Sequence, residues 1–147
     1  MTPTKTGVNQ LFIILTLFFL IPLGLATKFY HGPAKNWVTL YAGDIFYPMF
    51  WFFLGMLLFP AAHPLKMSLI VWLFSTAIEF TQLYDAPLLT ALRRSFVGRT
   101  LVGTSFVPLD ILYYFIGCLL ALLLYYALHF FRLPVTSTKP ESQNKAF

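Results

Sequence analysis

The stretch "LKMSLIVWLFSTAIEFTQLY", residues 65–84, decides the fold of this chain. It has the length of a membrane-spanning helix, which takes about 20 residues, but Glu79 and Gln82 lie near its end. Its nine Leu, Ile, Val or Phe residues favour insertion by about 4 to 5 kcal/mol, whereas a carboxylate at the centre of a membrane helix costs about 3 kcal/mol. Because this margin is thin, we expect the acid to face other helices rather than lipid.

The composition of the whole chain indicates that lipid is its solvent. The 147 residues are 59% hydrophobic and 10% charged, whereas soluble domains carry about 25% charged residues. Three more apolar runs have membrane-spanning length, and they are continuous rather than alternating, which excludes strands. The sequence therefore predicts an all-α integral membrane bundle of four transmembrane helices, at about 11–27, 44–60, 65–84 and 109–131.

One domain, residues 1–132, is expected, followed by a disordered polar tail at 133–147. The first apolar run has a second interpretation as a cleaved signal peptide, because Lys5 precedes it and "GLA" ends it. The connection at 61–64 is so short that the second and third helices must be antiparallel neighbours.

The long connection between the third and fourth helices contains "DAPLLTALRRSF", residues 85–96. This pattern predicts a short amphipathic helix that starts at Asp85, with apolar residues on one face and the two arginines opposite. Such a helix either lies on the membrane surface, as interfacial helices do, or packs over the bundle. The sequence leaves these two alternatives open.

The charge pattern points to lipid headgroups rather than nucleic acid as partners. The net charge is +5, and the basic residues lie between or beyond the apolar runs. They divide five against five between the two sides of a four-span protein, so the positive-inside rule assigns no orientation. If the arginines of the long connection serve a site and are discounted, both termini fall in the cytoplasm. The single cysteine, Cys118, excludes an intramolecular disulfide.

Three acids are expected to gather at one side of the membrane. Asp44 opens the second helix, Glu79 lies about one turn from the end of the third, and Asp110 opens the fourth. In this topology Arg99 lies on the same side. The sequence thus predicts a polar ligand-binding pocket at the level of the interface, formed by Glu79, Gln82, Arg99, Asp110, Asp44 and Tyr114.

Within this pocket Arg99 is expected to meet an anionic group and Gln82 to donate or accept a hydrogen bond. Glu79 and Asp110 are expected to orient the arginine. The helical spacing supports an inward face on the fourth helix, where Gly117 and Ala121 form a small-xxx-small pair that favours close helix contact.

Other functions use the same residues differently. Glu79 would carry protons in a small oligomeric transporter, or it would only lock the helices together in a structural or assembly subunit. An enzyme with Glu79 and Asp110 as acid and base is less favoured, because no residue nominates a substrate. The chain shows no nucleophile series, no phosphate loop, no cofactor motif and no metal-ligand spacing among its histidines, so neither a metal nor a cofactor is expected.

The order of these motifs carries a family resemblance. "EFTQ" at 79–82, "GR" at 98–99, Asp110, "YY" at 113–114 and Gly117 resemble the VanZ-like group of small bacterial membrane proteins. The wider stretch 28–120, with "GPAKNW", "GDIFY" and "GRTLVGTSF", is similar to an uncharacterised bacterial membrane family known as a domain of unknown function.

The resemblance implies a multi-pass protein of the bacterial inner membrane. The Glu, Gln, Arg and Asp of the VanZ-like group correspond to Glu79, Gln82, Arg99 and Asp110. Many VanZ-like sequences carry Asn where this chain has tyrosines, and some of these proteins are associated with glycopeptide tolerance. The expected partners are membrane lipid, a lipid-linked or small polar ligand, and further copies of the chain, but not nucleic acid.

Overall fold

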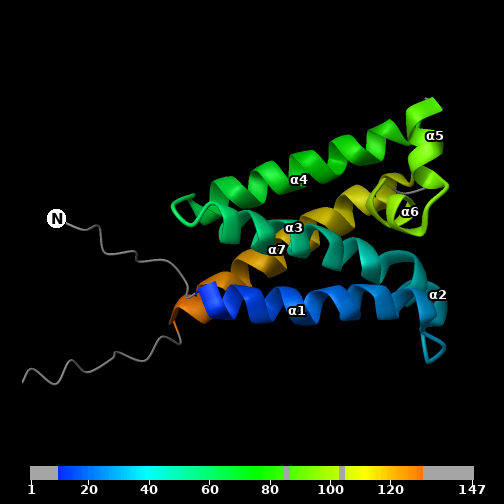
Figure 1. Ribbon diagram of the computed structural model, residues 1–147. Coiled ribbons are helices and arrows are strands. Elements are labelled where there is room, and N and C mark those ends of the chain that lie inside the picture. The colour runs from blue at the N-terminus through cyan, green and yellow to red at the C-terminus, as the bar shows by residue number, and fades with distance from the viewer. Residues whose placement is uncertain (1–9, 85–86, 103–104, 131–147) are drawn as a thin grey trace, which may run out of the picture.

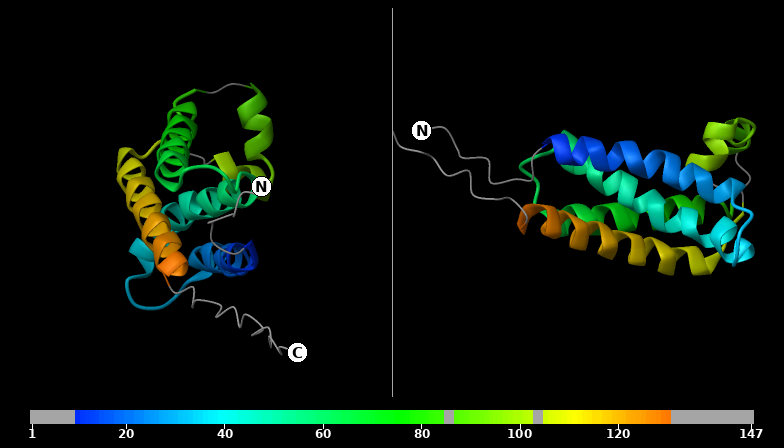
Figure 2. Two further views of the ribbon diagram at one scale, coloured as in Figure 1. Left: turned by 90° about the vertical axis from the view of Figure 1, so that its left-hand side faces the viewer. Right: turned by 90° about the horizontal axis from the view of Figure 1, so that it is seen from below.

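The computed structural model describes residues 10–84, 87–102 and 105–130, and all regular secondary structure in these ranges is helical. Four long helices lie side by side, and the short helices gather at one end of them (Figure 1, Figure 2). The elements are α1 (Gln10–Ala26), η1 (Thr27–Phe29), α2 (Lys35–Trp37), η2 (Val38–Ala42), α3 (Gly43–Leu58), α4 (Pro64–Thr81), α5 (Pro87–Arg93), α6 (Phe96–Val102) and α7 (Pro108–Phe130).

Helix α3 is the centre of the bundle. It packs against α1, α4 and α7, and α7 also packs along α4. Phe52, Phe53 and Met56 of α3 are almost wholly buried, as is Ala121 of α7. Most of the remaining core side chains are also apolar. Where these side chains would otherwise be exposed to water, their burial holds the helices together.

Three helical stretches among the described residues are long and apolar enough to cross a membrane: Gln10–Phe29, Lys35–Leu58 and Pro108–Phe130. They carry three of the four predicted spans. The second stretch begins before the predicted residue 44, because α2 and the π-helical η2 lead directly into α3. Helix α4 is not among them, since Lys66 and Glu79 lower the hydropathy of its 18 residues.

The connection between α4 and α7 forms two short helices where one was predicted. The break comes at Ser95, whose Oγ donates to the carbonyl of Leu92 at 3.0 Å and accepts from the N–H of Gly98 at 2.9 Å. A serine that accepts from the third N–H of the next helix is a favourable N-cap, so α6 starts anew. The predicted cap at Asp85 and the predicted tail at 133–147 lie outside the described residues.

The predicted close approach at Gly117 is present. A Cβ on Gly117 would collide with the backbone carbonyl of Ile45 and would lie 2.6 Å from Cγ of Pro48. The buried Ala121 follows one turn later. Helices α3 and α7 therefore meet almost backbone to backbone, as small residues allow in membrane bundles.

We predict that Gly117→Ala destabilises the bundle by about 1–3 kcal/mol, because the added methyl group must push the backbone of α3 away. The matched control is Gly24→Ala in α1, where the new Cβ would lie an ordinary 3.6 Å from Cβ of Phe46. Alanine favours helix over glycine, so the control should be neutral or more stable. Unfolding of both variants in mixed micelles measures the difference, and equal stability would contradict the contact.

Candidate functional site

The carboxylate of Glu79 is fully buried and accepts three hydrogen bonds. The backbone N–H of Val107 donates to Oε1 at 2.7 Å. Gln82 Nε2 and the Tyr114 hydroxyl donate to Oε2 at 2.8 and 3.0 Å. A carboxylate has acceptor sites for all three donors. Glu79 therefore joins α4 to α7 and to the segment that precedes α7.

Local sequence explains how α4 delivers this side chain. Met67, Val71, Ser75 and Glu79 recur every four residues and are all buried, so they form the inner face of the helix. Gln82 follows one turn after Glu79, which is the spacing at which side chains on a helix meet. Helix α4 ends beside this pair.

The end of α4 is also held by a cation. Arg93 of α5 donates from Nη2 to the carbonyl of Thr81 at 3.4 Å. A guanidinium at a helix C-terminus complements the unpaired carbonyls and the helix dipole there. Arg93 was not among the predicted site residues, and its guanidinium is bound to the C-terminus of α4.

Asp44 and Asp110 lie in the first turns of α3 and α7, where the helix dipole favours negative charge. Both are half-buried and are close enough to interact electrostatically with each other and with Glu79. Among the described residues, neither side chain accepts a hydrogen bond. These two carboxylates thus differ from Glu79, because no donor in the described part of the chain satisfies them.

The cation near Asp44 and Asp110 is Lys28, which was not among the predicted site residues. It interacts electrostatically with both Asp44 and Asp110. Its Nζ lies beside Gly43, where an added Cβ would be 3.4 Å from it. The signal that could have found it is its position, because Lys28 directly follows the first apolar run on the side where the acids gather.

Arg99 is not brought together with the acids. It is exposed on α6, and its side chain makes no hydrogen bond or ion pair with any residue that the structure describes. Helix α6 is anchored by Tyr47, whose hydroxyl donates to the carbonyl of Leu101 at 2.9 Å, and its buried Gly98 packs against the backbone of Leu92 in α5. The next residue along a helix points about 100° away, so Arg99 faces outward.

Three aromatic side chains contact one another at the same end of the bundle as the two aspartates. The rings of Tyr41 and Tyr113 stack with centroids 4.7 Å apart, and Trp37 Nε1 donates to the Tyr113 hydroxyl at 3.0 Å. Tyr41 precedes Asp44 by three residues and Tyr113 follows Asp110 by three, so each ring lies one turn from an acid. The end of the bundle thus combines carboxylates with aromatic faces.

All six residues predicted to form a pocket lie at this end of the bundle (Figure 1), but Arg99 on α6 contacts none of the other five. Glu79, Gln82 and Tyr114 are bonded to one another, and Asp44 and Asp110 interact with Glu79 at longer range. In the described part of the chain, no group of three or more His, Cys, Asp or Glu side chains could hold a metal ion.

We predict that Glu79 and Tyr114 are energetically coupled. Tyr114→Phe should cost about 0.5–1.5 kcal/mol, the net value of a typical hydrogen bond. In the Glu79→Gln background the same change should cost clearly less, which gives a coupling energy of about 0.5–3 kcal/mol in a double-mutant cycle. Tyr113→Phe is the matched control, because its hydroxyl accepts from Trp37 and does not touch Glu79. Additive effects for Glu79 and Tyr114 would contradict the bond.

Comparison with known proteins supports part of the sequence interpretation. No curated protein and no solved structure matches the chain significantly. A family described as "protein of unknown function (DUF2809)" matches residues 33–118, which include the acids, Tyr114 and α4. Nothing links the chain to the VanZ-like group specifically. Since the match covers more than half of the sequence, the chain belongs to this family of unknown function.

Proposed function

We propose that this protein is a four-span protein of the bacterial inner membrane in which Asp44 and Asp110 bind the amine of a polar or lipid-linked cell-envelope ligand. The proposal rests on one observation. The carboxylates of Asp44 and Asp110 are half-buried and accept no hydrogen bond from any residue that the structure describes. Charged groups removed from water need compensation, and a ligand can supply it.

The charge balance decides the sign of the ligand. Asp44, Glu79 and Asp110 interact with one another, while Lys28 is the cation that interacts with Asp44 and Asp110. Arg99 points away, so the anion-binding role predicted for it loses its support. Three carboxyl groups therefore share this end of the bundle with one ammonium group, which favours a cationic ligand over an anionic one.

The aromatic rings favour an organic cation. Tyr41 lies one turn before Asp44, and Tyr113 lies one turn after Asp110. The ring of Tyr41 stacks on that of Tyr113, and Trp37 contacts the same tyrosine. Aromatic faces attract ammonium groups through the ring quadrupole, and such rings commonly recognise quaternary ammonium ligands. A metal ion needs converging ligands, and no group of three or more His, Cys, Asp or Glu side chains among the described residues provides them, so we favour an organic cation.

Glu79 has a different role in this proposal. It is wholly buried and its three hydrogen bonds come from the protein itself. We regard it as a positioning residue that holds α4 and α7 in register, so that Asp110 keeps its place beside Asp44. This role is close to one alternative that the sequence left open, in which Glu79 only holds the helices together.

The fourth span is α4. It packs along α3 and α7, and Leu69, Ile70 and Leu73 project apolar side chains outward at 53–60% exposure. Of the two charged residues that lower its hydropathy, Glu79 faces inward and Lys66 lies exposed in the first turn of the helix. Lipid therefore meets an apolar surface on α4 as on its neighbours. The single domain of residues 1–132 and cytoplasmic termini complete this proposed topology.

We predict that soluble headgroup amines stabilise the purified protein in detergent. Ethanolamine and choline should raise the unfolding temperature, because a ligand that binds only the folded state stabilises it. Asp44→Asn and Asp110→Asn should each reduce this rise several-fold, whereas Arg99→Gln should leave it unchanged. Acetate and phosphate serve as anionic probes. A rise with phosphate that Arg99→Gln abolishes would overturn the proposal in favour of an anion site.

Cysteine labelling in whole cells tests the four spans. Residues 31, 63 and 99 are exposed, and Cys118, the native cysteine, is buried. In single-cysteine variants made on a Cys118→Ser background, we expect positions 31 and 99 to react from one side of the membrane and position 63 from the other. Reaction of positions 63 and 99 from the same side would show that α4 does not cross.

A further inference from the structure

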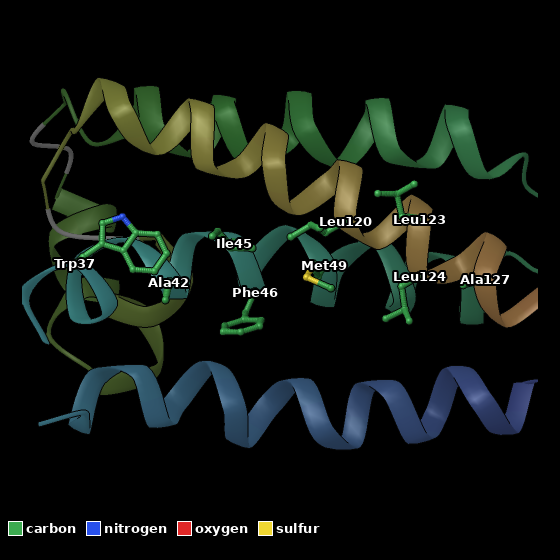
Figure 3. Close-up of a pocket in the computed structure, with 9 residues that line it drawn as sticks. All are labelled: Trp37, Ala42, Ile45, Phe46, Met49, Leu120, Leu123, Leu124 and Ala127. Carbon is green, nitrogen blue, oxygen red and sulfur yellow. The ribbon is translucent and has the colours of Figure 1, made fainter. Parts of the chain in front are cut away.

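An apolar groove of about 600 Å³ lies over α3, between α1 and α7 (Figure 3). Its floor and wall are almost wholly hydrocarbon, and Trp37 forms one end. The lining residues are Trp37, Ala42, Ile45, Phe46, Met49, Leu120, Leu123, Leu124 and Ala127. This volume is within the range of about 300–1,000 Å³ found for small-molecule sites.

The groove is separate from the acid site. Ile45, Phe46 and Met49 recur at the spacing of one helical face of α3. Asp44 and Tyr47 project from the opposite face by the same periodicity. The groove and the acids therefore lie on opposite faces of α3, and Trp37 lies where the two meet, since its ring ends the groove and its Nε1 donates to Tyr113.

A flexible chain fits this groove better than another helix does. Close docking of membrane helices requires small residues spaced four apart. The small pair of α7, Gly117 and Ala121, is already buried against the bundle. In the groove, Ala127 is preceded four residues earlier by Leu123. The groove thus lacks the small pair that favours the closest helix contact, and an acyl chain can follow its uneven surface of leucine side chains.

The end of the groove at Trp37 supplies the complementary charge for a lipid headgroup. Trp37 lies in the connection between α1 and α3, where tryptophan suits the boundary of a membrane. Residues 28–43 of this connection carry Lys28, His31 and Lys35 and no acid. Lys28 faces Asp44, so the exposed Lys35, two residues before Trp37, remains available to an anionic group.

We propose that the groove over α3 binds one acyl chain of an anionic phospholipid whose headgroup lies beside Lys35. The bound lipid fills the space between α1 and α7. The lipid is recognised by its hydrocarbon through the α3 and α7 side chains and by its negative charge through the connection before α3.

Native mass spectrometry of the full chain, released from nanodiscs of phosphatidylglycerol and phosphatidylcholine, tests the proposal. We expect the protein to retain one lipid, with phosphatidylglycerol enriched several-fold. Leu123→Trp should fill the groove and lower retention several-fold. Leu119→Trp is its control, because Leu119 is similarly exposed on α7 but does not line the groove.

The headgroup is tested in the same measurement. Lys35→Gln should remove the preference for phosphatidylglycerol, while Lys66→Gln, at the start of α4, should preserve it. Several outcomes would overturn the proposal. They are retention of no lipid, equal loss in both tryptophan variants, an unchanged preference in Lys35→Gln, or a dimer of the chain that Leu123→Trp abolishes, which would place a second copy in the groove.

Discussion

The structure depends on satisfying one carboxylate inside an otherwise apolar bundle. Glu79 is fully buried, and a charged or polar group without partners in such surroundings is strongly unfavourable. Its three donors come from α4 itself, from α7 and from the backbone just before α7. Because hydrogen bonds are directional, these bonds help to define how far along α7 the helix α4 must sit. Two more bonds cross the same interface, from Ser68 to the Cys118 carbonyl and from Trp72 to the Ile111 carbonyl.

The same constraint divides the acids between two tasks. Both carboxylate oxygens of Glu79 accept from protein donors, while Asp44 and Asp110 open their helices without such donors among the described residues. Glu79 holds α4 and α7 together, and Asp44 and Asp110 beside it form the proposed ligand site. Helix α3 separates this polar face from the apolar groove, so one central helix presents opposite environments on its two sides.

Much of this arrangement could be predicted from local sequence patterns. Continuous apolar runs located the long helices, and the thin insertion margin of residues 65–84 predicted that Glu79 faces inward, which its burial confirms. Arg99 and Lys28 show where such reasoning fails. The direction of Arg99 depends on the contact between Tyr47 and the Leu101 carbonyl, and the Val107 donor is a backbone group. No side-chain pattern announces either, since both arise from tertiary packing.

The chain order of the donors around Glu79 has a consequence for biogenesis. Ribosomes make α4 before Val107 and Tyr114 exist, so two of its three bonds must wait for the last helix. Meanwhile the short connection at residues 59–63 keeps α4 beside the strongly apolar α3. In the proposed four-span topology, α3 and α4 therefore insert together as a hairpin, and the emergence of α7 completes the assembly.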